Sequence, residues 1–128
     1  MASEGITILC VDDEQVPRTL RKLVLQKQGY NVVTAASGKE ALALLDEGGI
    51  TLVLSDQLMP GMSGTELTKI IKADWPATPV ILLSGVNEMP EGATCADRFV
   101  SKVEGPEILF QAVAEVLQEH GYIFEKNT

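Results

Sequence analysis

The chain has 128 residues, enough for one domain with a buried core, and its content of 45% hydrophobic and 22% charged residues is typical of a folded globular protein. Its 18 acidic and 10 basic residues give a formal net charge of −8, which argues against direct binding to nucleic acid or to an anionic membrane, because both need a basic surface. No apolar run approaches the roughly 20 residues of a membrane-spanning helix. The start, MASEG, lacks the basic region and the apolar core of a signal peptide, so a cytoplasmic location is expected.

Short apolar runs rich in β-branched residues alternate with segments whose apolar residues repeat at helical spacing. In chain order they predict a strand at 6–11, a helix at 15–28, a strand at 31–35, a helix at 38–47, a strand at 51–54, a helix at 64–74, strands at 79–83 and 97–100, and a helix at 105–120. This alternation predicts one α/β domain, a doubly wound five-stranded parallel sheet with helices on both faces. The domain is expected to fill residues 1–128, with its core at about 5–120 and a C-terminal tail at 121–128.

Local signals support these boundaries. Ser37, with Glu40 three residues later, has the pattern of a capping box at the start of a helix. Gly29 and Gly121 stand where the first and last helices should end. His120, in the last turn of its helix, is interpreted as a capping residue, because a helix C-terminus favours positive charge.

Polar side chains follow four of the five predicted strands. Asp12, Asp13 and Glu14 follow the first strand, Asp56 the third, Ser84 the fourth and Lys102 the fifth. The carboxyl ends of parallel strands meet at one edge of the sheet, where open α/β sheets bind their ligands. These side chains are therefore expected to share one site.

Carboxylates at one point need a compensating cation, because two of them about 4 Å apart repel by roughly 4 kcal/mol at an effective dielectric constant of about 20. Oxygen ligands without Cys or His suit a hard ion, and a site with few protein ligands suits Mg²⁺ better than Ca²⁺. Lys102 offers a compact positive charge to a phosphoryl oxygen, and Ser84 offers a hydroxyl group to another. Asp56 remains available as a nucleophile.

Four motifs, VDDE, SDQLMPGMSG, ILLSG and FVSK, each close a predicted strand. In this order they resemble the receiver domain of bacterial two-component response regulators, and the resemblance covers the whole chain. Its most specific part is residues 56–64, DQLMPGMSG. The resemblance implies a flavodoxin-like sheet with the strand order 2-1-3-4-5.

The same resemblance implies a function. A sensor histidine kinase or a phosphotransfer protein would donate a phosphoryl group to Asp56 in a Mg²⁺-dependent reaction, and the acyl phosphate would switch a surface that a downstream output protein or domain reads. On this interpretation the chain is a phosphoaccepting signalling domain and not an enzyme with a separate substrate. The implied metal ligands are Asp12 (mainly through water), Asp13, Asp56 and the backbone carbonyl of Leu58. The implied phosphate-binding residues are Ser84 and Lys102, and the implied switch residues are Ser84 and Phe99.

The sequence departs from the family pattern in two places. Residues 86–96, VNEMPEGATCA, are all that remain for the fourth helix, and Pro90 and Gly92 predict a shortened or irregular helix of at most about two turns. The output surface should therefore be unusual. Val103 stands where the family often has a proline joined by a cis bond. A cis bond without proline costs about 2.5–4 kcal/mol, so a trans bond is predicted.

Other classes of protein share parts of the pattern. A phosphatase of the haloacid dehalogenase type also forms an aspartyl phosphate, but it needs a second acid two positions after its nucleophile, where Leu58 stands. A nucleotide or flavin binder uses a similar sheet, but neither G-x-G-x-x-G nor a Walker pattern follows the first strand. A degenerate receiver that serves only as a binding scaffold is a milder alternative, against which the complete set of acids, Ser84 and Lys102 weighs.

Overall fold

The computed structural model describes residues 5–85 and 95–122. Its elements are β1 (Thr7–Val11), α1 (Gln15–Lys27), β2 (Asn31–Ala35), α2 (Gly38–Glu47), β3 (Leu52–Asp56), α3 (Gly64–Asp74), β4 (Val80–Ser84), β5 (Arg98–Ser101) and α4 (Pro106–Glu119). Each strand and helix with predicted bounds is present, with ends that differ only slightly from those bounds. The short or irregular helix predicted within 86–96 lies outside the described residues, except for Cys95 and Ala96.

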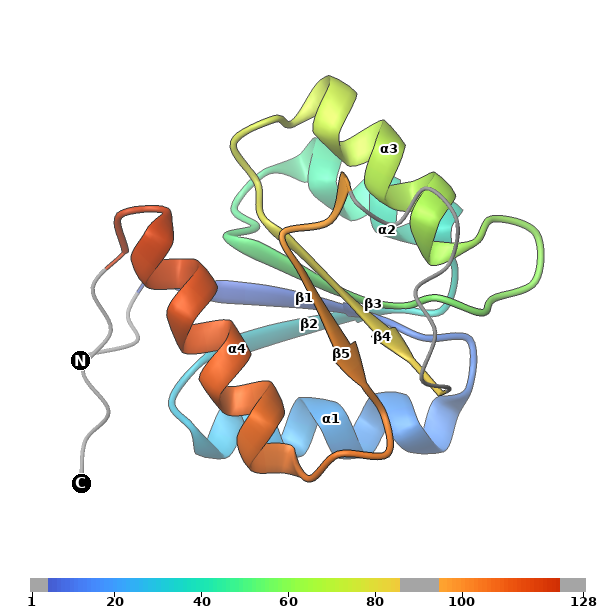
Figure 1. The fold of residues 1–128 in the computed structure, drawn as a ribbon. Coiled ribbons are helices and arrows are strands. Elements are labelled where there is room, and N and C mark those ends of the chain that lie inside the picture. The colour runs from blue at the N-terminus through green and yellow to red at the C-terminus, as the bar shows by residue number, and fades with distance from the viewer. Residues whose placement is uncertain (1–4, 86–94, 123–128) are drawn as a thin grey trace.

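The strands form one parallel five-stranded sheet in the order β2-β1-β3-β4-β5, as the family resemblance implied. Figure 1 shows α1 and α4 on one face of this sheet and α2 and α3 on the other. The predicted doubly wound fold is therefore confirmed. Because β1 and β3 are neighbours inside the sheet, the residues that follow them leave its carboxyl edge side by side.

Successive residues of β1 point to opposite faces of the sheet and enter two separate cores. Ile8 and Cys10 pack in the core under α1 and α4, whereas Leu9 and Val11 pack in the core under α2 and α3. The helices contribute Leu25, Val113 and Leu117 to the first core and Leu45, Leu67 and Ile71 to the second. β1, which ends just before the first acids of the site, is thus packed on both of its faces.

Helix α1 buries less apolar surface than its sequence pattern suggests. Leu25 is fully buried, but Val16, Leu20 and Leu23 are 69%, 58% and 51% exposed. Helical spacing therefore predicted the helix correctly without identifying the face that packs on the sheet. These three residues form an exposed apolar stripe that begins next to the carboxyl edge of the sheet.

Two helices begin at a serine cap. Ser37 Oγ accepts the N–H of Glu40 at 3.1 Å, but the Glu40 carboxylate accepts the N–H of Ala36 at 3.3 Å, so the predicted capping box is incomplete. A complete capping box starts α3, where Ser63 Oγ accepts the N–H of Glu66 at 3.1 Å and the Glu66 carboxylate accepts the N–H of Ser63 at 3.0 Å. The start of α3 is therefore fixed locally, next to the end of β3.

Three further predictions are confirmed. His120 is the C-cap of α4, and its Nδ1 lies 2.9 Å from the carbonyl oxygen of Val116. Gly29 and Gly121 follow helix ends with φ of 102° and 85°, a conformation that favours glycine. Within residues 5–85 and 95–122 every peptide bond is trans, including the bond that precedes Val103.

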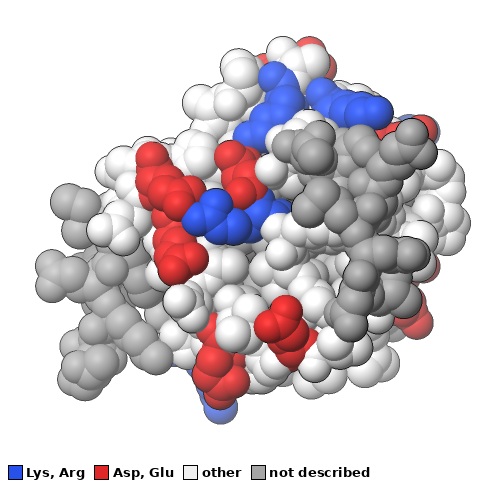
Figure 2. Space-filling view, viewed as in Figure 1, with Lys and Arg blue, Asp and Glu red and all other residues white. Residues whose placement is uncertain are grey.

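The surface is unevenly charged. Figure 2 shows acidic side chains gathered over α4 and basic side chains over α3. Arg98 and Glu119 form an ion pair between β5 and the end of α4. Of the helices in the described part of the chain, none is long and apolar enough to cross a membrane.

Candidate functional site

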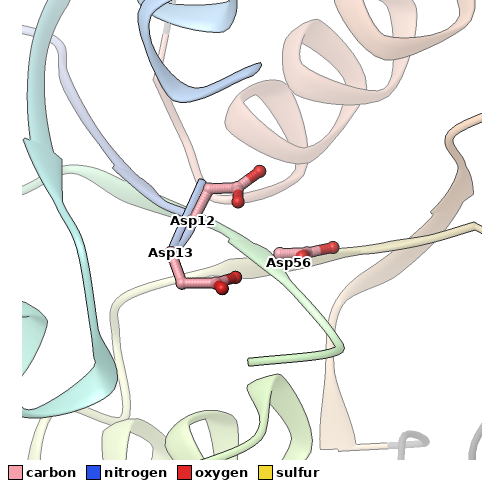
Figure 3. Close-up of side chains that lie close together, drawn as sticks. All are labelled: Asp12, Asp13 and Asp56. Atoms are coloured by element: carbon pink, nitrogen blue, oxygen red, sulfur yellow. The ribbon is translucent and has the colours of Figure 1, made fainter. Parts of the chain in front are cut away.

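Three carboxylates meet at the carboxyl edge of the sheet. Val11 of β1 pairs with Ser55 of β3, so the residues that come next, Asp12 and Asp56, lie beside each other. Asp13 follows Asp12, and one ligand oxygen from each of the three acids lies within 4.8 Å of the others. Figure 3 shows the three carboxylates extending to the same side of the backbone. Strand register therefore brings together the acids that the motifs predicted.

The three acids differ in their exposure to solvent. Asp12 is fully buried, Asp56 is 4% exposed, and Asp13 is exposed. Burying a charged carboxylate is unfavourable unless it is paired or hydrogen-bonded. The two buried acids therefore need partners within the chain.

Lys102 is the partner of Asp56, with its Nζ 2.5 Å from Oδ1 of the acid. The sheet fixes its position, because Ser84 pairs with Ser101 across β4 and β5, and the N–H of Lys102 donates to the carbonyl oxygen of Ser84 at 2.6 Å. Ser84 is buried at the end of β4, one residue after the partner of Asp56 in the ladder. The predicted phosphoacceptor, hydroxyl and ammonium groups therefore share one edge.

Burial raises the pKa of the Asp56 carboxyl group above its ordinary value, because the charged form loses its hydration. The hydrogen bond and charge of Lys102 oppose this effect, and the neighbouring charge of Asp12 adds to it. The charge of Arg21 also opposes the effect of burial. Burial outweighs both cations, so the pKa of Asp56 stays above its ordinary value.

Asp12 is held by residues that the motifs did not single out. Arg21 in α1 places its Nη1 3.0 Å from Oδ2 of Asp12, and the N–H of Glu14 donates to Oδ1 at 2.9 Å. Arg18 donates to the backbone carbonyl of Asp12 at 2.8 Å. The sequence signal for these contacts was a pair of arginines three positions apart, which lie on one face of the helix that follows the acids.

The remaining candidates lie near the site without a contact that defines their role. Leu58 follows Asp56 by two residues, and its side chain is 76% exposed. Phe99 lies in β5 opposite Leu82 of β4 and is half-buried. The metal-ligand role of Leu58 and the switch role of Phe99 therefore stay predictions.

A close backbone contact positions the start of α3 against the site. The N–H of Gly64 donates to the carbonyl oxygen of Gln57 at 2.9 Å. A Cβ at position 64 would lie 2.4 Å from the carbonyl oxygen of Asp56 and 2.8 Å from Leu82. Only glycine fits there without a shift of the backbone. Gly64, the last residue of the DQLMPGMSG motif, thus allows α3 to begin close to Asp56, the first residue of the motif.

Two of the three acids have a paired cation. Arg21 pairs with Asp12 and Lys102 pairs with Asp56, but Asp13 makes no ion pair with any residue that the structure describes. One carboxylate is therefore left without a paired cation. An all-oxygen site of this kind suits a hard divalent cation such as Mg²⁺.

Residues 8–121 match the family model of the response regulator receiver domain. The chain belongs to this family. This receiver is 34% identical over 122 residues to the uncharacterized transcriptional regulatory protein YkoG of Bacillus subtilis, and 32% identical over 123 residues to the transcriptional regulatory protein GlrR of Escherichia coli. The two alignments cover 92% and 93% of the receiver. They span 53% of YkoG and 28% of GlrR, so both relatives are considerably longer.

Solved receiver structures share the fold. The response regulator TrrA of Thermotoga maritima, solved in complex with Mg²⁺ and BeF, is 35% identical with a TM-score of 0.83, and the match covers 88% of this receiver and 99% of TrrA. A receiver domain from Clostridium thermocellum is 28% identical with a TM-score of 0.83, covering 89% and 95% of the two chains. The predicted fold and family are therefore confirmed, and the acidic cluster fits phosphorylation and Mg²⁺ binding.

Proposed function

We propose that Asp56 accepts a phosphoryl group and becomes an acyl phosphate. The observation that carries the proposal is the convergence of charges on this residue. Asp56 is buried, and one of its carboxylate oxygens lies within 4.8 Å of a carboxylate oxygen from each of the other two acids. Nζ of Lys102 lies 2.5 Å from its Oδ1. Phosphoryl transfer depends chiefly on positioning and on neutralisation of negative charge, and this arrangement offers both.

The metal ligands would be Asp12, Asp13, Asp56 and the backbone carbonyl of Leu58. The fit to Mg²⁺ rests on oxygen donors and on an exposed Asp13 that makes no ion pair within the described residues. When bound, Mg²⁺ would supply positive charge to the acids and to the phosphoryl oxygens. The complex of TrrA with Mg²⁺ and BeF supports this assignment by similarity.

Lys102 and Ser84 would each hold one phosphoryl oxygen. Lys102 already contacts the acceptor carboxylate, and its backbone N–H donates to the carbonyl oxygen of Ser84, so the two residues are held side by side. If the Ser84 hydroxyl turns toward a phosphoryl group, space opens beside the neighbouring strand β5, which carries Phe99. An inward turn of Phe99 would transmit phosphorylation to the surface of β5 and α4.

The phosphoryl donor would be a sensor histidine kinase or a phosphotransfer protein. Val16, Leu58 and Val103 are 69%, 76% and 72% exposed, and each lies within three residues of an acid or of the lysine of the site. Exposed apolar side chains around a charged centre suit contact with a partner protein. They provide an apolar rim on which a helix that carries a phosphohistidine can rest.

We infer one receiver domain over residues 1–128, with its core at about 5–120 and its tail at 121–128. It would act in the cytoplasm as a phosphoaccepting switch that has no separate substrate, and it would transmit its state to an output protein or domain. The names of YkoG and GlrR support transcription as the process that this output controls.

Incubation with acetyl phosphate and Mg²⁺, followed by intact mass measurement, tests the proposal. The wild type should gain one phosphoryl group, and Asp56→Asn should gain none. Asp46→Asn is a matched control, because it makes the same change at an exposed acid of α2. Labelling of Asp56→Asn at the wild-type level, or of neither protein, would refute the assignment and favour a receiver that acts only as a scaffold.

A further inference from the structure

Asp12 is held by the chain through both of its carboxylate oxygens. Oδ2 lies 3.0 Å from Nη1 of Arg21, and Oδ1 accepts the N–H of Glu14 at 2.9 Å. The side chains of Asp12 and Arg21 are 0% and 12% exposed. Charge-assisted hydrogen bonds shielded from solvent in this way are stronger than exposed ion pairs. Asp12 is thus committed to contacts inside the chain, whereas Asp13 is not.

The packing of α1 directs Arg21 to the site. Leu25 lies one turn after Arg21 on the same helix face, and it is fully buried against the sheet. The residues on the other side of the helix, among them Leu20 and Leu23, are exposed. Because the buried face of α1 carries both Leu25 and Arg21, the guanidinium group is a fixed part of the site and not a loose surface charge.

Arg21 and a divalent cation are attracted by the same acids and repel each other. With Arg21 and Lys102 in place, one of the three acids has no paired cation. Without Arg21, two of them would have none. Arg21 therefore reduces the negative potential that is available to a metal ion.

We propose that Arg21 is a resident counter-cation that holds Asp12 and lowers the affinity of the site for Mg²⁺. The inference rests on the proposed metal site and adds a positioning residue to it. Each oxygen of Asp12 accepts only one of these hydrogen bonds and keeps a further lone pair, so Asp12 stays in the ligand set while Arg21 fixes its orientation. Arg21 thus sets the Mg²⁺ concentration at which the domain becomes ready for phosphorylation.

Calorimetric titration with Mg²⁺ tests the inference on the wild type, Arg21→Gln and Arg18→Gln. Arg21→Gln is expected to bind Mg²⁺ about tenfold more tightly, which corresponds to about 1.4 kcal/mol. Arg18→Gln is the matched control, because it removes one charge from the same helix face but contacts only the backbone carbonyl of Asp12. Its Mg²⁺ affinity should rise clearly less than that of Arg21→Gln, since Arg18 also repels the ion but does not hold a ligand carboxylate.

Two further measurements separate tuning of the metal site from a general structural role. Without Mg²⁺, Arg21→Gln should have a lower midpoint of thermal unfolding than the wild type, because Asp12 is left buried without its partner. Addition of Mg²⁺ should raise this midpoint more in Arg21→Gln than in the wild type, because the ion then neutralises Asp12. Arg21→Lys keeps the charge and should restore the wild-type dissociation constant to within about threefold.

Unchanged or weaker Mg²⁺ binding by Arg21→Gln would overturn the role of Arg21, and so would an equal gain in Arg18→Gln. An Arg21→Gln variant that stays unfolded even in saturating Mg²⁺ would also overturn it, because Arg21 would then be required for the fold itself. Absence of Mg²⁺ binding in the wild type and in every variant would instead refute the proposed metal site.

Discussion

At the amino edge of the sheet, one acid is surrounded by donors of the chain. Asp97 Oδ2 accepts the ammonium group of Lys72 at 2.7 Å and the N–H of Val80 at 2.7 Å, and Oδ1 lies 3.5 Å from Nε2 of His120. This cluster ties together α3, β4, β5 and α4. The charge of Lys72 balances that of Asp97, so the single acid of this cluster has a paired cation within the chain.

At the carboxyl edge the balance is the opposite. Arg21 and Lys102 pair with two of the three acids, and the third, Asp13, makes no ion pair with the described residues. Both edges contain close ion pairs, so the presence of an ion pair does not distinguish a structural cluster from a functional one. The comparison teaches that the distinguishing property is an acid that remains without a paired cation.

The same substitution at the two edges should have different consequences. Lys102→Met removes the cation beside the phosphoacceptor and is expected to slow acetyl phosphate labelling about a hundredfold, the effect of removing one preorganised charge-stabilising donor. Lys72→Met removes one donor of Asp97 and should lower the free energy of unfolding by about 1–2 kcal/mol while labelling continues. The measurements are labelling rates by intact mass and denaturant unfolding.

Each lysine variant serves as the control for the other. A large loss of labelling in Lys72→Met, with the protein still folded, would contradict the division between the two edges. Normal labelling in Lys102→Met would remove Lys102 from the proposed site.

The carboxyl edge should also be sensitive to its backbone contacts. Gly64→Ala places a Cβ 2.4 Å from the carbonyl oxygen of Asp56 and should lower the free energy of unfolding by more than about 2 kcal/mol. Gly85→Ala is the control, because no heavy atom lies within 4 Å of its added Cβ and its φ is not in the left-handed region. That variant should change stability by less than about 0.5 kcal/mol. If denaturant unfolding showed equal losses of stability in the two variants, the close contact between α3 and β3 would not be what excludes a side chain at position 64.

Neutralising an acid should have opposite signs at the two edges. Without metal, Asp13→Asn relieves repulsion among the three acids and should raise the free energy of unfolding by about 0.5 kcal/mol. Asp97→Asn weakens bonds to its donors and should lower it by about 1 kcal/mol. Denaturant unfolding in the presence of a metal chelator measures both changes in the free energy of unfolding. A loss of stability in Asp13→Asn would mean that the charges at the carboxyl edge are balanced after all.

Most of the fold could be predicted from the sequence. The apolar runs predict the strands of the sheet, and the polar residues that follow these runs indicate its carboxyl edge. The pattern did not show which face of α1 is buried. Val16, Leu20 and Leu23 are at helical spacing, yet they are exposed, while Leu25 carries the packing. Periodicity gives the helix and its apolar residues, but the rotation of the helix depends on the sheet it meets.

The site residues that stand at strand ends could be predicted from the sequence. The long side chains that reach the site from helices could not. Asp12, Asp56, Ser84 and Lys102 meet because the strand register brings them together. The contact of Arg21 with Asp12 depends instead on the tertiary placement of α1, and the contact of His120 with Asp97 depends on that of α4. Such contacts join residues of different elements, so two arginines three positions apart do not by themselves indicate which acid they reach.

The pairing of Val11 with Ser55 has one more consequence. A slip of β1 by a single residue against β3 would turn every side chain of β1 to the opposite face and carry Asp12 away from Asp56. An ion that binds acids from both strands, as proposed, would bind only the correctly aligned sheet. Bound Mg²⁺ would therefore stabilise the native register of β1 and β3 by mass action.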